Sequence, residues 1–456
     1  MRIHTHRLCL SLLALCLSAG VAPAAEAPPL VMAAKQGDTA ALRTLLAEGM
    51  VVNAAEGDGT TALHWASYRD NPDAAGLLLE AGADVNATND LGATPLWSAS
   101  QNGSVAMVGR LLEAGADSNL ALWSGETPLM VASRAGATGV VALLLERGAE
   151  TDARAARGQT ALRWAAAQQH ADVVTALVAD GADIHARSEV WSQVMAVPPH
   201  SQPEYKREIP HGGNTALMFA ARGGALETVR VLVAAGADVD DTDAWGVSAT
   251  TVATHAGFTE VVELLLQAGA DANAAEAGFA AIHPAVMRQD ERLVATLLDH
   301  GADPNATLRT WTPIRRSSRD FHFAPPLVGA TPFWLAARFA APSIMRLLVE
   351  HGADPAFVHH ADYKEPTYFQ PRLEETTALM AVTGMGGGRL RAWFPPARDE
   401  AEMRALESVQ LLVELGADLN ATDADGRTAL DGARSARLKT VAAYLESHGA
   451  FASAGW

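Results

Sequence analysis

A Gly-Ala-Asp tripeptide recurs along this chain of 456 residues at a nearly constant spacing. From Gly49 to Gly181 the glycines are separated by four steps of 33 residues. A fixed period of this length indicates an array of one small unit stacked on its neighbours, rather than a single folded core. Full copies begin at Gly82, Gly115, Gly181, Gly236, Gly269, Gly301, Gly352 and Gly416, a Glu-ending copy begins at Gly148, and a truncated copy begins at Gly449.

A second motif, similar to Thr-Pro-Leu, recurs with the same period as the first. Thr is a good N-cap because its side-chain oxygen accepts an N–H of the first helical turn, and a following Pro has no N–H to leave unpaired. Apolar runs such as residues 140–145 then indicate a longer helix, which the glycine of Gly-Ala-Asp ends. Copies begin at Thr61, Thr94, Thr127, Thr160, Thr215, Thr331, Thr377 and Thr428, with degenerate copies at Ser248 and Ala280.

Together these motifs resemble the ankyrin repeat, which opens with Thr-Pro-Leu-His and closes with Gly-Ala-Asp-Val-Asn-Ala. Residues 82–87 match that closing segment at every position. The resemblance implies an all-α solenoid of stacked helix-turn-helix units with extended finger loops, which recognises other proteins through its concave face and fingers. It also implies that His64 and His283 form hydrogen bonds within their repeats. We count eleven units, ending at the glycines 49, 82, 115, 148, 181, 236, 269, 301, 352, 416 and 449.

Residues 1–24 have the features of a secretory signal peptide. Arg2 and Arg7 precede an apolar run that is too short for a permanent membrane anchor, and a small-x-small sequence ends at Ala24. A buried first helix is the alternative, although the repeat phase begins only near residue 28. We therefore expect residues 25–456 to form a single solenoid in the periplasm or outside the cell, without an integral membrane segment and as a monomer.

Both cysteines, Cys9 and Cys16, lie in the expected signal peptide. The mature chain would then have no thiol and no disulfide, which suits an oxidising compartment. The net charge of −18 becomes −20 when Arg2 and Arg7 are removed, and this makes general nucleic-acid binding a poor expectation.

Sequence motifs give no support for catalysis. The chain has no P-loop, no nucleophile elbow, no strand-linked dinucleotide fingerprint and no His-Glu-x-x-His zinc motif. His359 and His360 lie near Asp362, but adjacent side chains of an extended segment point in opposite directions. We expect no enzyme activity, no cofactor and no metal site.

Four insertions interrupt the period, near residues 187–211, 306–328, 357–375 and 385–403. The first three lie between a Gly-Ala-Asp and the next Thr start, so they should enlarge finger loops. The fourth, which opens with a glycine-rich segment, lies between the two helices of one unit. We call them insertions 1 to 4. A further local irregularity is Pro284, which is expected to weaken the first helix of its unit.

The insertions are rich in aromatic and Arg residues, as interface hot spots are. They either bind a partner or fold back and bury their own aromatic side chains. Insertion 2 is locally basic, through Arg309, Arg315, Arg316 and Arg319. That charge either receives an anionic group or pairs with the acidic Gly-Ala-Asp rows of the same molecule.

Arginine also recurs seven or eight residues after the cap starts. The resemblance places these positions on the concave face, where they form either a cationic groove or ordinary family consensus. They are Arg69, Arg134, Arg222, Arg288, Arg338 and Arg434.

The sequence thus predicts a non-catalytic scaffold that binds one or more proteins outside the cytoplasm. Two alternatives stay open: a pocket for a small anionic ligand, with or without enzymatic activity, formed by the insertions, and a structural spacer that protects envelope proteins. The candidate partner-binding residues are Tyr68, Trp123, Arg134, Trp191, Tyr205, Arg222, Trp245, Trp311, Arg315, Arg316, Arg338 and Tyr368.

Overall fold

The computed structural model describes residues 27–196, 203, 206–312, 322–364, 370–388 and 397–453. The expected signal peptide, residues 1–24, lies outside these ranges. The chain divides into two compact units, one that ends at Ala156 and one that runs from Arg157 to Trp456. No helix in the described ranges has the length and apolar character needed to cross a bilayer.

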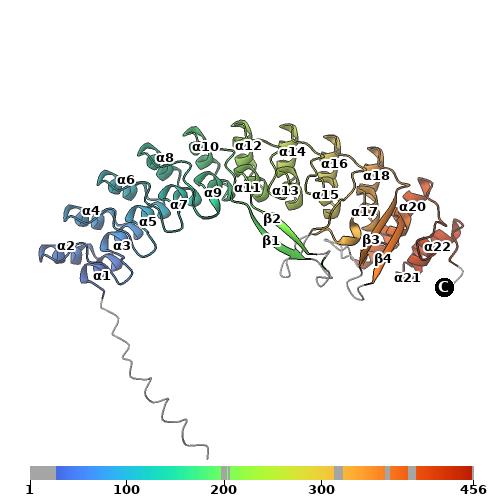
Figure 1. Ribbon diagram of the computed structural model, residues 1–456, viewed down its shortest axis with the longest axis horizontal. Helices are drawn as coiled ribbons and strands as arrows, with labels where there is room; N and C mark the ends of the chain where they lie inside the picture. The colour runs from blue at the N-terminus through green and yellow to red at the C-terminus, as the bar shows by residue number, and fades with distance from the viewer. Residues whose placement is uncertain are drawn as a thin grey trace, which may run out of the picture. The chain divides into compact units, whose positions relative to one another are not determined.

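The first unit is built of consecutive helix pairs (Figure 1). Helices α1, α3, α5 and α7 contact one another in turn, and α2, α4, α6 and α8 do the same in a second layer. Their bounds are α1 Pro29–Gln36, α2 Thr39–Ala47, α3 Ala62–Tyr68, α4 Pro72–Glu80, α5 Pro95–Asn102, α6 Val105–Glu113, α7 Pro128–Ala135 and α8 Thr138–Glu146.

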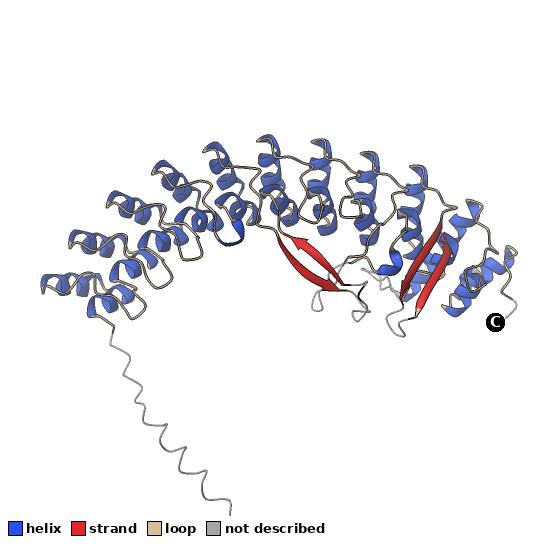
Figure 2. Ribbon diagram, in the orientation of Figure 1, coloured by secondary structure: helices blue, strands red, loops and turns tan. Residues whose placement is uncertain are grey.

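The second unit continues the same pattern through α22 (Figure 2). Odd-numbered helices again contact odd-numbered ones from α9 to α21, and even-numbered helices contact even-numbered ones from α10 to α22. Their bounds are α9 Ala161–Ala167, α10 Ala171–Ala179, α11 Ala216–Gly223, α12 Leu226–Ala234, α13 Ala249–Ala256, α14 Thr259–Gln267, α15 Ile282–Arg288, α16 Glu291–Asp299, α17 Pro332–Arg338, α18 Pro342–Glu350, α19 Ala378–Val382, α20 Arg398–Glu414, α21 Ala429–Ser435 and α22 Lys439–Ser447. Two short 3-10 segments are η1 Ala156–Gly158 and η3 Pro325–Leu327.

Helix starts follow the Thr motif, and second helices such as α4, which ends at Glu80, stop just before the glycine of Gly-Ala-Asp, here Gly82 at φ 86°. In α5, Thr94 is the N-cap and its hydroxyl oxygen accepts the Trp97 N–H at 3.1 Å, while Pro95 occupies the first helical position. The turn after this helix uses Gly103 at φ 73°, a left-handed conformation that a side chain would strain. The capped-helix prediction from the Thr motif is confirmed.

Burial within the stack explains why the helices cannot stand alone. Small Ala side chains of the first helices let adjacent units approach closely, and Leu side chains of the second helices fill the space between the layers. Ala66, Ala99, Ala132, Leu78, Leu111 and Leu144 are all 0% exposed.

Asn side chains join the finger loops of neighbouring repeats. Asn86 Nδ2 donates to Gly115 O at 3.2 Å, and Asn86 Oδ1 accepts the Asp117 N–H at 2.9 Å. The same bridge recurs between Asn305 and the Gly352 and Asp354 backbone, although insertion 2 separates these residues in sequence. The insertion therefore leaves the regular stacking intact.

In two units a His at the fourth residue of the Thr motif bonds to the backbone beyond its own helix pair. His64 Nδ1 accepts the Thr61 N–H at 3.2 Å, so its Nε2–H donates to Ala93 O at 2.8 Å. His283 is held in the same way by the Ala280 N–H at 3.1 Å and Ala306 O at 3.1 Å. The expectation of structural His residues is confirmed; the His64 bond reaches the residue before the next Thr start, and the His283 bond reaches the start of insertion 2.

Pro284 does not break its helix. The helix α15 begins at Ile282, so Pro284 lies in its first turn, where an N–H would have no helical acceptor. Pro284 and its neighbours in α15 are buried. Pro284 therefore lies inside the first helix of its unit, as the sequence predicts, but at a position that costs no helical hydrogen bond, and the expected weakness of this unit stays a prediction.

Two insertions form β-hairpins, which the all-α expectation did not include. In insertion 1, β1 Trp191–Ala196 pairs antiparallel with β2 Lys206–His211. In insertion 3, β3 Val358–Lys364 pairs with β4 Pro371–Thr377. The scaffold itself remains an α-helical solenoid, and the hairpins extend from its finger loops.

Insertion 4 is partly helical rather than a loop throughout. Helix α20 starts at Arg398, inside the predicted insertion 385–403, and is 17 residues long, whereas the other second helices have 9 residues. Part of the extra sequence therefore lengthens a scaffold helix at its N-terminal end.

Candidate functional site

Insertions 1 and 2 contact each other through Arg207. Its guanidinium donates to Thr310 Oγ1 at 2.6 Å and lies over the Trp311 ring, 4.9 Å from the ring centre. Trp311 is only 6% exposed. The Trp311 ring therefore packs under Arg207 of insertion 1. Its burial favours a structural role over direct contact with a partner.

Insertions 2 and 3 contact each other next to α17, through His359. The buried His359 ring packs on Trp334 with ring centres 4.2 Å apart, and its Nε2 lies 3.1 Å from Val328 O. His360 is exposed on the other side of β3, as the alternation of an extended segment predicts. Burial lowers the pKa of His359 to about 4, so this imidazole is neutral at pH 7.

Insertions 3 and 4 share one carboxylate. Glu374 accepts the Tyr363 hydroxyl at 2.6 Å and the Gly387 N–H at 2.8 Å. Arg338 Nε donates to Gly386 O at 3.0 Å, so the glycine-rich start of insertion 4 covers this arginine. Burial lowers the pKa of Arg338, and nearby Glu374 partly offsets that effect. Arg338 therefore belongs to a closed network and not to an open groove.

Four other arginines of the predicted concave row also have partners within the chain. Arg134 forms an ion pair with Glu126 at 2.6 Å, and Arg222 donates to Asn214 Oδ1 at 3.1 Å. Arg288 donates to His255 O at 2.9 Å, and Arg434 pairs with Glu446 at 2.7 Å. These contacts favour a structural role for the row over a free cationic groove.

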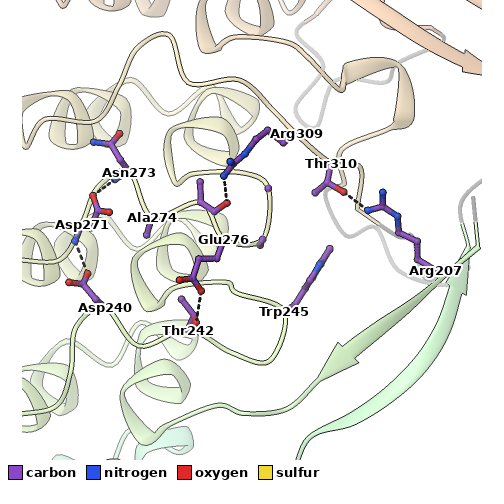
Figure 3. Close-up of a pocket in the computed structure, with 13 residues that line it drawn as sticks. Arg207, Asp240, Thr242, Trp245, Asp271, Asn273, Ala274, Glu276, Arg309 and Thr310 are labelled. Carbon is purple, nitrogen blue, oxygen red and sulfur yellow. Dashed lines mark hydrogen bonds between the residues drawn. The ribbon is translucent and has the colours of Figure 1, made fainter.

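A pocket of about 980 Å³ lies in the second unit (Figure 3). Its walls are the finger loops after α12 and α14, together with Arg207 of β2 and residues 309–310 of insertion 2. Trp245 lies between the acidic finger residues and Arg207 in this view. Its ring contacts Phe279 edge-on at 5.9 Å, and Phe279 contacts Phe323 of insertion 2 at 5.2 Å.

The first unit carries an exposed aromatic side chain on a finger loop. Trp123 is 80% exposed, yet its indole Nε1 donates to Asp90 O at 2.8 Å and its backbone N–H donates to Leu91 O at 3.0 Å. Leu91 beside it is 68% exposed. Tyr68, at the end of α3, is 53% exposed and packs edge-on against Trp65.

The remaining candidates divide into two groups. Trp191 in β1 is 38% exposed, stacks on His211 with ring centres 4.4 Å apart, and lies under Arg157. The other four, Tyr205, Arg315, Arg316 and Tyr368, lie outside the described residues. Among the described residues, no group of three or more His, Cys, Asp and Glu side chains could hold a metal ion.

Sequence reasoning missed Glu374, which organises two insertions. No motif marks this residue, because its role depends on the register of β4 against β3, where Ala361 is its cross-strand partner. Its two acceptor oxygens are used by groups from different insertions, and such a convergence is visible only in three dimensions.

Stacked helix pairs, bridged through finger-loop Asn residues, define an α-helical repeat solenoid. The chain belongs to the ankyrin-repeat family. The family model for ankyrin repeats in three copies matches residues 8–89, 30–122, 77–155, 96–188 and 217–308, and the model for a single ankyrin repeat matches residues 328–360. Ankyrin repeats generally mediate protein–protein interaction, which is consistent with a non-catalytic binding scaffold.

The crystal structure of the human ASB11 ankyrin repeat domain is similar over 53% of this chain and 98% of that chain, with 31% identity and a TM-score of 0.44. No curated protein matched the sequence.

Proposed function

We propose that this protein is a non-catalytic scaffold that captures a protein partner outside the cytoplasm and is itself monomeric. The observation that carries the proposal is Trp123, an aromatic side chain that is 80% exposed and nevertheless fixed by a hydrogen bond from its indole to Asp90 O. A preoriented Trp loses little conformational entropy on binding, which is why such side chains dominate interface energies.

The surroundings of Trp123 support a contact surface in the first unit. Leu91 is 68% exposed next to it, and the Trp123 backbone N–H is bonded to the Leu91 carbonyl. Burial of both side chains by a partner would remove apolar surface from water without rearranging the finger loops. A fixed apolar tip of this kind fits a shallow apolar depression on another protein.

The proposed location rests on the N-terminal sequence and on cysteine placement. Arg2 and Arg7 before a short apolar run are typical of a cleaved leader, and both cysteines fall within the same segment. We propose cleavage after Ala24, followed by a mature solenoid of eleven repeats in the periplasm or medium. The pairing of α1 with α2 through α21 with α22 in the described residues supports this repeat number. The acidic balance of 52 Asp and Glu against 34 Lys and Arg supports a partner other than nucleic acid.

A small anionic ligand is the second candidate function. What favours it is the pocket of about 980 Å³, which two arginines of insertions 1 and 2, Arg207 and Arg309, help to line. In this case the ankyrin scaffold would hold a binding pocket instead of a protein interface.

In-cell photo-crosslinking tests the proposed function. A photoreactive phenylalanine analogue at position 123 should give a discrete crosslinked protein that mass spectrometry identifies in the extracytoplasmic fraction. Phe451, which is 62% exposed at the C-terminal end, provides the matched control position and should give no such product. Equal products at both positions, or none at 123, would contradict capture through this finger.

A further inference from the structure

We infer that the pocket between the finger loops of the second unit receives a carboxylate side chain of the partner, with Arg207 and Arg309 as its cationic contacts and Trp245 as its apolar wall. The inference rests on the proposed function and names the chemistry of the partner segment. We call this site the arginine pocket.

Arg207 is held in place without neutralising its charge. One N–H of its guanidinium donates to the neutral Thr310 hydroxyl at 2.6 Å, and the guanidinium lies 4.9 Å from the Trp311 ring centre. No carboxylate within the described part of the chain forms an ion pair with it. Its other N–H donors are therefore oriented but available for an anionic acceptor.

Arg309, in insertion 2, is likewise bonded to a neutral acceptor and has no carboxylate partner among the described residues. Its Nη2 donates to the Ala275 carbonyl at 2.6 Å, and the described residues provide it with no carboxylate partner. The side chain is exposed and lines the pocket. Two guanidiniums held by neutral acceptors therefore line one pocket, and each can contact an anionic group.

Arg207 and Arg309 differ in this respect from several other arginines of the described residues. Arg134 is paired with Glu126, Arg187 with Asp241, and Arg427 with Asp423. In a protein with 18 more acidic than basic side chains, cations without a carboxylate partner are not explained by a shortage of acids. Trp245 lies between Arg207 and the finger carboxylates (Figure 3), and Arg309 donates to the carbonyl of Ala275 and not to the neighbouring Glu276 carboxylate.

Carboxylates of the finger loops form one wall of the pocket, and they favour a peptide over a small polyanion as the ligand. Asp240 Oδ1 accepts the Asp271 N–H at 2.7 Å, and Glu276 Oε2 accepts the Thr242 hydroxyl at 3.2 Å. These finger carboxylates lie on the side of the pocket away from Arg207, with Trp245 between them (Figure 3). A small polyanion would face repulsion from this wall, whereas a peptide segment can direct one carboxylate to the arginines and place an apolar residue against Trp245.

Fluorescence polarisation with defined peptides tests the inference on the full mature chain. The probe is a fluorescein-labelled peptide, Gly-Ser-Gly-Phe-Glu-Gly-Ser-Gly, and its control replaces Glu by Gln. We expect the Glu peptide to bind at least about tenfold more tightly than the Gln peptide at low salt, because a charge-assisted contact is lost in the control. Binding of the Glu peptide should weaken as sodium chloride is raised.

Variants locate the binding. Arg309→Gln and Arg207→Gln should each weaken the Glu peptide about tenfold or more, whereas Arg230→Gln, an equal charge change at an exposed arginine paired with Glu227, should leave it unchanged. Glu276→Gln should strengthen binding by removing a like charge from the wall. Arg207→Gln could weaken the packing of the β1–β2 hairpin, but Arg309 lies outside that hairpin, so Arg309→Gln still tests the inference. Circular dichroism checks that both variants are folded.

Equal binding of the two peptides, or equal loss in Arg230→Gln, would overturn the inference. Binding of citrate that depends on Arg207 and Arg309, without binding of the Glu peptide, would also overturn it and would favour the small-ligand function. If the peptides fail while photo-crosslinking at position 123 still captures a protein, the proposed function stands and only the arginine pocket is wrong.

Discussion

The indole Nε1 of Trp334 donates a 3.1 Å hydrogen bond to the backbone carbonyl of Thr376, the residue immediately before the next Thr start. His64 makes the equivalent bond to Ala93 O in the first unit, at 2.8 Å. Trp334 and Thr376 are separated in sequence by insertion 3, whereas His64 and Ala93 are separated by a regular repeat. A larger donor side chain therefore preserves the link between repeats where a hairpin has been inserted.

Replacing Trp334 tests this link. Trp334→Phe removes the indole donor and leaves the buried Thr376 carbonyl without that partner, so we expect the free energy of unfolding to fall by about 1–3 kcal/mol. Urea unfolding followed by circular dichroism measures the change. Trp123→Phe at an 80% exposed position is the control and should shift stability by no more than about 0.5 kcal/mol. Similar losses in the two variants would contradict the proposed role of Trp334.

Buried histidines should make the fold sensitive to acid. Burial lowers the pKa of His283 and of His359 to about 4, while an unfolded His titrates near 6.5. Between these values the unfolded chain binds more protons than the folded chain, so stability is full above about pH 6.5 and is lost as the pH falls toward 4. Each residue would contribute up to about 3 kcal/mol over that window.

Urea midpoints at pH 7 and pH 4.5 measure this acid sensitivity. The variants His283→Gln and His359→Gln should each show a smaller loss of stability on acidification than the natural chain, because the titrating group is gone. Carboxylates titrate in every variant alike, and His300→Gln at an exposed position controls for the substitution itself. An unchanged difference between the two pH values in both buried variants would refute the prediction.

The glycine-rich start of insertion 4 should be more sensitive to substitution at Gly386 than at Gly384. A Cβ at Gly386 would lie 2.6 Å from Thr376 Oγ1, whereas a Cβ at Gly384 would meet nothing within 4 Å. Both residues have positive φ, 73° and 89°, so the comparison isolates the clash from backbone strain. Gly386→Ala should lose about 1–3 kcal/mol more stability than Gly384→Ala and should expose insertion 4 to limited proteolysis. Equal effects would show that the contact with β4 is not required.

Shortening the hairpin of insertion 1 should separate stability from binding. Replacing residues 194–208 by Asn-Gly retains the pair Gln193 and Ile209 and joins it by a favoured two-residue turn. Because Ile209 is 3% exposed and stays in place, we expect helical content and the unfolding transition to be kept. Arg207 is lost, so capture of the Glu peptide and of the partner should weaken. Unchanged capture by the shortened protein would argue against a binding role for this hairpin.

The scaffold could be predicted from the sequence because each unit is specified by local signals. Thr94 and Pro95 start helix α5 and Gly103 ends it, and all three signals lie within or next to the helix itself. The insertions could be located by the lost period, but their internal structure could not be derived. The segments of β3 and β4 pair through a register that no turn signal marks, and Arg338 changes from an expected groove residue to a covered one because Gly386 and Gly388 approach it from 48 and 50 residues away.

The most direct test of the central claim is the affinity of the mature protein for the partner identified by crosslinking, measured with the natural chain, Trp123→Ala and Phe451→Ala. Loss of a fixed, exposed Trp at an interface should weaken binding by about 2 kcal/mol or more, which is a rise in Kd of roughly thirtyfold. Phe451→Ala should bind like the natural chain, and all three proteins should unfold at the same urea concentration. A Kd that is the same for Trp123→Ala and the natural chain would contradict the account.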